Sequence, residues 1–164
     1  MPAGRPQPHR GATFIIRATL HDVSVLGEVL HAFRDTHALE QVADNIELGM
    51  IELGIIEALT NVVKHGHAGG ADARIEVLYQ EFADRIVVEI IDRGRAMPPA
   101  GLDRADERAF DFDLANLASL PESGMGLALI KRSFDSIDYS SSSGENRLRL
   151  MKSLGGAPAA ATAP

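Results

Sequence analysis

The sequence contains no cysteine and no tryptophan, and only 5% of its residues are aromatic. Without cysteine the chain can form neither a disulfide nor a thiolate zinc site. No apolar run approaches the roughly 20 residues that a membrane-spanning helix needs. The first ten residues, rich in proline and arginine, lack the apolar centre of a signal peptide. These absences predict a cytoplasmic protein with no membrane segment.

Positive charge is also scarce, because 16 lysines and arginines stand against 23 acidic residues and give a net charge of −7. Such a chain is a poor general binder of nucleic acid or anionic membranes, so neither is expected as a partner. Hydrophobic and charged contents of 45% and 24% are typical of globular proteins. With 164 residues, the chain is long enough for one domain with a substantial core.

The composition divides the chain into a central domain and two tails. Residues 1–11 are rich in proline, glycine and arginine, and residues 155–164 are mostly alanine and proline, so we expect both to be flexible. A single domain would then occupy residues 12–154. Within it, residues 93–123 are polar and weakly periodic, and so long a connection in a compact domain indicates a lid or mobile segment.

Hydrophobic periodicity predicts an alternation of strands and helices. The expected strands are 13–18, 74–81, 85–92, 135–140 and 147–152, and the expected helices are 23–36, 44–66 and 127–134. Asp22 is the expected cap of the first helix. The order predicts an α+β fold, a two-layer sandwich of a mixed, mostly antiparallel sheet with helices on one face.

The helix at 44–66 carries the most informative pattern. Asp44 to Glu47 has the form of a capping box, and Gly66 stands where a left-handed residue would end the helix. Apolar residues at steps of three and four form one face, namely Leu48, Ile51, Ile55, Leu59 and Val62. Glu57, Asn61, Lys64 and His65 fall on nearly the opposite face. Taken alone, that face is also typical of a solvated Glu–Lys surface whose last cations complement the helix dipole.

Two shorter motifs accompany this helix. Asp92 continues the inward row of the strand at 85–92, and a buried carboxylate there needs a partner. Gly124-Met125-Gly126 precedes the last helix, whose first amides, from Leu127 onward, can hold phosphates. Each motif alone is also common, the first as a strand-ending turn and the second as a glycine pair before a helix.

Together and in this order, the motifs resemble the ATP-binding fold of the GHKL superfamily, and within it the RsbW-type anti-sigma-factor serine/threonine kinases. The motif of Glu, Asn and His on one helix matches Glu57, Asn61 and His65. The Asp-x-Gly motif matches Asp92-Arg93-Gly94, and the Gly-x-Gly motif matches Gly124 to Gly126. The resemblance covers about residues 13–154 and includes a final turn, Asn146, and a strand that ends with Lys152.

The resemblance implies an ATP site with Mg²⁺ as cofactor. Asn61 would give a carbonyl oxygen to Mg²⁺, which prefers oxygen and retains waters. Glu57, one turn earlier, would act as the general base. Asp92 would accept a hydrogen bond from the adenine amino group. The remaining nucleotide-binding positions would be Lys64, His65, Gly94, Gly124, Met125, Gly126 and Leu127, with direct contact by His65 left open.

The implied activity is a protein kinase that phosphorylates a STAS-domain antagonist and sequesters a sigma factor or another regulatory target, as a homodimer. Three alternatives stay open: a nucleotide-dependent binding protein without transfer, an ATP-hydrolysing or sensor-kinase-like enzyme, and an interaction domain without nucleotide. One departure is that Arg95-Ala96 follows Gly94 where the superfamily often has a second glycine, which puts the adenine-side loop in doubt. His21, His31, His37 and His67 show no metal spacing and are expected at the surface.

Overall fold

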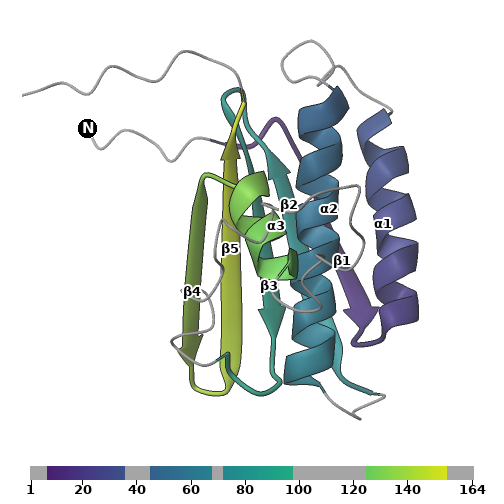
Figure 1. Ribbon diagram of the computed structural model, residues 1–164, viewed down its shortest axis with the longest axis vertical. Coiled ribbons are helices and arrows are strands. Elements are labelled where there is room, and N and C mark those ends of the chain that lie inside the picture. Colours follow the sequence, from purple (N-terminus) through teal and green to yellow (C-terminus); the bar gives the residue numbers. More distant parts are fainter. Residues whose placement is uncertain (1–6, 36–44, 68–71, 98–124, 155–164) are drawn as a thin grey trace, which may run out of the picture.

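The computed structural model describes residues 7–35, 45–67, 72–97 and 125–154 (Figure 1). Their elements are β1 (Arg10–Arg17), α1 (Leu20–Asp35), α2 (Asn45–Asn61), the π-helical turn η2 (Val62–Gly66), β2 (Arg74–Glu81), β3 (Arg85–Asp92), α3 (Met125–Ser133), β4 (Ser136–Ser142) and β5 (Glu145–Ser153). The expected cap at Asp44, the glycine at Gly124 and most of the expected lid lie outside the described residues. β1 begins at Arg10, inside the segment assigned to the tail.

The strands form one five-stranded sheet in the order β1-β2-β3-β5-β4. Every neighbouring pair is antiparallel. Figure 1 shows α1, α2 and α3 on the same face of this sheet, so the predicted α+β two-layer sandwich is confirmed. The parallel pairing allowed by a mixed sheet does not occur among the described strands. None of the described helices is both long and apolar enough to cross a membrane.

The core lies between the helices and the sheet, where the predicted periodicities place it. Every second side chain of β2 and β3 is buried on this side, namely Ile75, Val77, Tyr79, Ile86, Val88 and Ile90. From α2, the side chains that pack into this core are Leu48, Ile51, Ile55 and Leu59, each at most 2% exposed. The inward row of β3 therefore carries Asp92 to the sheet end beneath the last turn of α2.

The first helix starts earlier than predicted, and its cap differs. α1 begins at Leu20, and the hydroxyl of Thr19 accepts a hydrogen bond of 3.1 Å from the backbone N–H of Asp22. Thr19 is therefore the capping residue, and the prediction of Asp22 is wrong. The Asp22 carboxylate instead accepts hydrogen bonds from the Arg17 guanidinium, which lowers the pKa of Asp22 to about 2.

The end of the long helix also departs from the expected geometry. Ser143 and Gly144 are the described residues with positive φ, so the prediction of a left-handed Gly66 is wrong. The chain leaves α2 through the wider turn η2, after which His67 has φ −126°. The Gly66 carbonyl then accepts a 2.9 Å hydrogen bond from the N–H of Arg95, so a tertiary contact replaces the local cap.

α2 and α3 pack closely at Gly54. A Cβ atom at this position would lie 2.7 Å from Cβ of Ser133 and 2.8 Å from the ring of Phe134. Glycine therefore permits the approach that holds α3 against α2 in the middle of the molecule. At Gly49, five residues earlier in α2, an added Cβ atom would have no neighbouring atom within 4 Å.

We predict opposite effects of alanine at these two glycines of α2. Gly54→Ala forces α2 and α3 apart and should lower the free energy of unfolding by about 1–3 kcal/mol. Gly49→Ala, the matched control, should raise it by up to about 1 kcal/mol, because alanine favours a helix interior. Urea denaturation followed by circular dichroism measures both. Equal changes in the two variants would contradict the close packing at Gly54.

Candidate functional site

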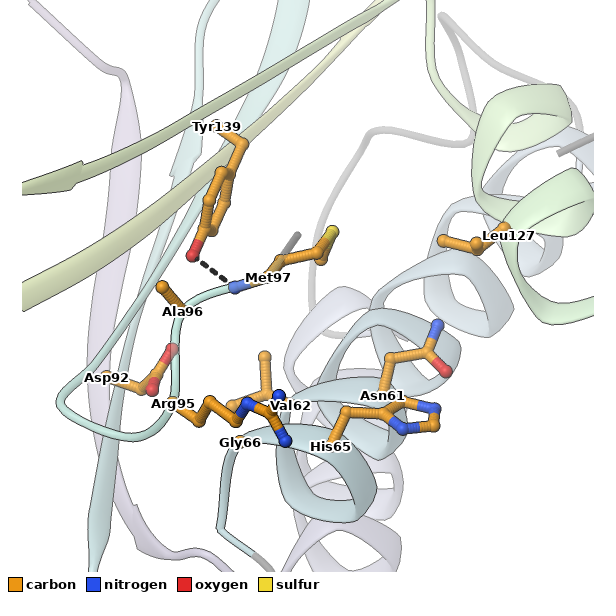
Figure 2. Close-up of a pocket in the computed structure, with 10 residues that line it drawn as sticks. All are labelled: Asn61, Val62, His65, Gly66, Asp92, Arg95, Ala96, Met97, Leu127 and Tyr139. Carbon is orange, nitrogen blue, oxygen red and sulfur yellow. Dashed lines mark hydrogen bonds between the residues drawn. The ribbon is translucent and has the colours of Figure 1, made fainter. Parts of the chain in front are cut away.

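A cavity of about 390 Å³ opens where α2 and η2 face the end of β3, next to β4 and the start of α3. It is lined by Asn61, Val62, His65, Gly66, Asp92, Arg95, Ala96, Met97, Leu127 and Tyr139. Figure 2 shows Asp92 and Tyr139 on the sheet side, with Asn61, His65 and Leu127 on the helix side. The walls combine apolar side chains with a few polar groups, as is typical of small-molecule sites.

The Asp92 side chain is 7% exposed, and three donors hold its carboxylate. Its Oδ1 atom accepts hydrogen bonds from the N–H of Gly94 at 2.7 Å, from Nδ2 of Asn146 at 3.1 Å and from Nε2 of His67 at 3.1 Å. All three bonds go to the same oxygen. The buried charge thus has protein partners, and among the described residues no donor bonds to Oδ2, which is the acceptor that a ligand in the cavity can use.

A polar network from the last hairpin fixes the loop after Asp92. Nδ2 of Asn146 also donates to the carbonyl of Gly94 at 3.0 Å. Oδ1 of Asn146 accepts from the hydroxyl of Tyr139, which itself accepts from the N–H of Met97 at 2.8 Å (Figure 2). Asn146 is only 3% exposed. The wall of the cavity is therefore shaped by β4 and β5, which come last in the described chain.

His67 was expected at the surface, and that prediction is wrong. Its side chain is 7% exposed and lies against the Asp92 carboxylate. The reason is the π-helical turn, which brings the chain over the end of β3 instead of ending the helix in solvent. His21 and His31 are exposed as predicted, while His37 lies outside the described residues.

Asn61 and Glu57 lie at the other end of the site. The Nδ2 atom of Asn61 is buried and has no hydrogen-bond partner among the described residues. Such an orphaned amide indicates a group that binds there. Glu57 does not line the cavity, but a Cβ atom on Gly126 would lie 2.8 Å from its Oε2. The first turn of α3 therefore lies directly against the Glu57 carboxylate, and a larger residue at position 126 would require that carboxylate to move.

The structure brings most of the expected site residues together. Asn61, His65, Asp92 and Leu127 line one cavity, and Gly94 and Gly126 contact residues of its wall or its rim. Lys64 is exposed and does not line the cavity. Met125 begins α3, and Gly124 lies outside the described residues.

Several lining residues were missed by the sequence reasoning, namely Val62, Gly66, Arg95, Ala96, Met97 and Tyr139. Strand alternation alone gave no sign that Tyr139 reaches the loop after β3. Arg95-Ala96, which stands where the superfamily often has a second glycine, does belong to the loop that forms this wall of the cavity. For Asn146, only the family resemblance marks the position, and hydrophobic periodicity does not.

The arrangement suits a purine nucleotide with a metal ion. An apolar slot with a carboxylate acceptor at one end fits a base, and the unpartnered Nδ2 donor of Asn61 at the other end fits a phosphate oxygen. In the described part of the chain, no group of three or more histidine, aspartate or glutamate side chains is arranged to hold a metal ion. Mg²⁺ fits such a site, because it needs few protein ligands when phosphate oxygens and waters complete its shell.

Comparison with known proteins agrees with this geometry. The family model of the histidine kinase-like ATPase domain matches residues 16–152. Serine-protein kinase RsbW of Bacillus pumilus is 26% identical over 133 residues, which cover 79% of this chain and 72% of the relative. Anti-sigma F factor of Clostridium beijerinckii is 24% identical over 106 residues, which cover 65% of this chain and 70% of the relative.

A solved structure supports the fold. The crystal structure of the RsbU and RsbW domains of Rv1364c from Mycobacterium tuberculosis aligns with a TM-score of 0.59 and 17% identity, over 90% of this chain and 32% of that one. These matches confirm the predicted GHKL fold and the RsbW-type resemblance.

We predict that the Tyr139 hydroxyl controls the order of the loop around Met97. In Tyr139→Phe the Met97 N–H loses its acceptor, so its hydrogen exchange should accelerate roughly 2- to 10-fold, the effect of one neutral hydrogen bond. The Arg95 N–H, bonded to Gly66, is the internal control and should exchange at the wild-type rate. Exchange measured by NMR distinguishes the two amides. An unchanged rate at Met97 would show that this bond does not hold the loop.

Proposed function

Since the chain belongs to the histidine kinase-like ATPase domain family, we propose that it is an ATP- and Mg²⁺-dependent serine/threonine protein kinase. Its substrate is a STAS-domain antagonist protein, and it also sequesters a sigma factor or another regulatory target. The observation that carries this proposal is the orphaned Asn61 amide, one helical turn after a Glu57 carboxylate that lies against the first turn of α3.

The residues of the cavity favour an adenine base at its sheet end, beside Asp92. The free Oδ2 of Asp92 can accept from the adenine amino group, which is a donor that guanine lacks at that position. Val62, Met97 and Leu127 supply apolar contacts to the faces of the base. The triphosphate then extends toward α3, whose first N–H groups suit phosphate oxygens.

In the phosphate-transfer step, Glu57 would lie next to the substrate hydroxyl that attacks the γ-phosphate. Its carboxylate accepts the proton of a substrate Ser or Thr hydroxyl while that oxygen bonds to the γ-phosphorus and the bond to ADP breaks. Mg²⁺, held by the side-chain oxygen of Asn61 and by phosphate oxygens, would neutralise charge on the phosphates. Most of the rate enhancement then comes from positioning and electrostatics.

The names of the relatives support the regulatory part of the proposal. One is a serine-protein kinase and one is an anti-sigma factor, so both kinds of protein occur among similar chains. A homodimer, expected from the same resemblance, belongs to this proposal.

We predict that Glu57→Gln abolishes phosphate transfer but leaves ATP binding. Purified protein is incubated with ATP, Mg²⁺ and a STAS-domain protein of the same organism, and the mass of the antagonist is followed. The transfer rate should fall at least about 100-fold in Glu57→Gln, because a general base contributes that much or more. Glu28→Gln, at an exposed position of α1, is the control and should keep the wild-type rate.

Two outcomes would reject the kinase assignment. An antagonist of unchanged mass with the wild-type protein, despite measurable ATP binding, would favour the nucleotide-dependent binding protein. Free phosphate released without modified antagonist would favour an ATP-hydrolysing enzyme.

We predict that Asn61→Leu separates stability from nucleotide binding. Replacing the orphaned buried amide by an apolar group of similar size should raise the unfolding free energy of the nucleotide-free protein by about 1 kcal/mol. For wild type, ATP with Mg²⁺ at 100 times its Kd should add about 2.7 kcal/mol. Asn61→Leu should lose most of this gain at the same concentration, as should wild type with EDTA. Full stabilisation of the variant by Mg-ATP would contradict the role given to Asn61.

A further inference from the structure

The contact between His67 and Asp92 fixes the hydrogen-bonding state of both side chains. Each side chain is 7% exposed, and Nε2 of His67 lies 3.1 Å from Oδ1 of Asp92. The other two partners of Oδ1 are the N–H of Gly94 and the amide Nδ2 of Asn146, which can only donate. Oδ1 is therefore an acceptor throughout, and Nε2 of His67 must carry the hydrogen that it donates.

The His67 ring packs against backbone atoms of the loop after β3. A Cβ atom at residue 94 would lie 2.7 Å from Cε1 and Nε2 of His67 and 2.5 Å from the Gly66 carbonyl oxygen. The ring thus packs directly on the Gly94 backbone, and no larger residue fits there. Gly94, the glycine of the Asp-x-Gly motif, therefore has a second role. Besides letting a ligand approach the backbone, it makes room for the His67 ring.

His67 and Asp92 also border a second hollow. Its other lining residues include charged side chains of β2 and β5, namely Arg74, Glu76 and Glu145. Asp92 therefore lines two depressions, and at the second one its carboxylate contacts the His67 ring. Removing the ring would release the carboxylate from one of its three donors.

We propose that His67 is a positioning residue that sets the selectivity of the cavity for a purine with a 6-amino group. The inference rests on the proposed function, in which Asp92 receives the adenine amino group. With three donors on Oδ1, rotation of the carboxylate is blocked and Oδ2 faces the ligand as a pure acceptor. A 6-oxo purine offers an oxygen at the same place, so two acceptors would meet and repel each other.

The test compares the affinities for ATP and for inosine triphosphate, which differ at this purine position. Wild type should prefer ATP. In His67→Leu, which retains bulk and removes the donor, the ratio of the two affinities should fall roughly 10-fold, the size of one hydrogen bond to a charged group. His67→Gln retains an N–H donor and should recover most of the ratio. His21→Leu, at an exposed histidine of α1, is the matched control. Isothermal titration calorimetry measures all four proteins.

The ratio distinguishes positioning from a general structural role. If His67 only supports the fold, His67→Leu weakens both nucleotides equally, and an unchanged ratio would overturn the inference while leaving ATP binding by the wild type intact. A wild type that binds neither nucleotide would overturn the proposed function and this inference with it.

A second measurement does not depend on any variant or ligand. Nitrogen-15 NMR of the nucleotide-free wild-type protein reports the tautomer of each histidine. We expect the proton of His67 on Nε2, and a ring protonated on Nδ1 alone would overturn the assignment even if His67→Leu failed to fold.

Discussion

The site depends on one crowded oxygen, Oδ1 of Asp92, which binds three donors from three parts of the chain. One donor follows the long helix, one lies in the loop after β3 and one is the second residue of β5. A buried carboxylate without such partners would destabilise the fold by several kcal/mol. The same bonds that make the charge tolerable thereby fix the distance between α2, β3 and β5, and so set the width of the cavity.

The architecture followed from patterns that are local in the sequence. The strands β2 and β3 lie at the predicted residues, because a sheet covered on one face requires strict alternation such as Ile86, Val88 and Ile90. The apolar stripe of α2 is equally regular. Asp92 could be placed from the same alternation, since it is simply the next inward position after Ile90.

Contacts between residues far apart in the sequence could not be predicted from local patterns. At the turn η2 the Gly66 carbonyl accepts a hydrogen bond from the N–H of Arg95, 29 positions later, and a pattern that cannot show this contact favours a left-handed glycine. His67 is buried for the same reason. Tyr139 and Asn146 lie on strands whose pattern gives the face of each residue but not its neighbours. The functional roles of Glu57, Asn61 and Asp92 stay predictions that rest on the family and on this geometry.

The position of Asn146 has a consequence for the order in which the protein becomes competent. It is 54 residues beyond Asp92, so a growing chain on the ribosome that has not yet released β5 lacks one of the three donors and the anchor of Tyr139. Until then, the adenine end of the cavity has no fixed wall. Under the proposed function, nucleotide can therefore stabilise only the finished domain, and truncated translation products gain nothing from the cellular ATP pool.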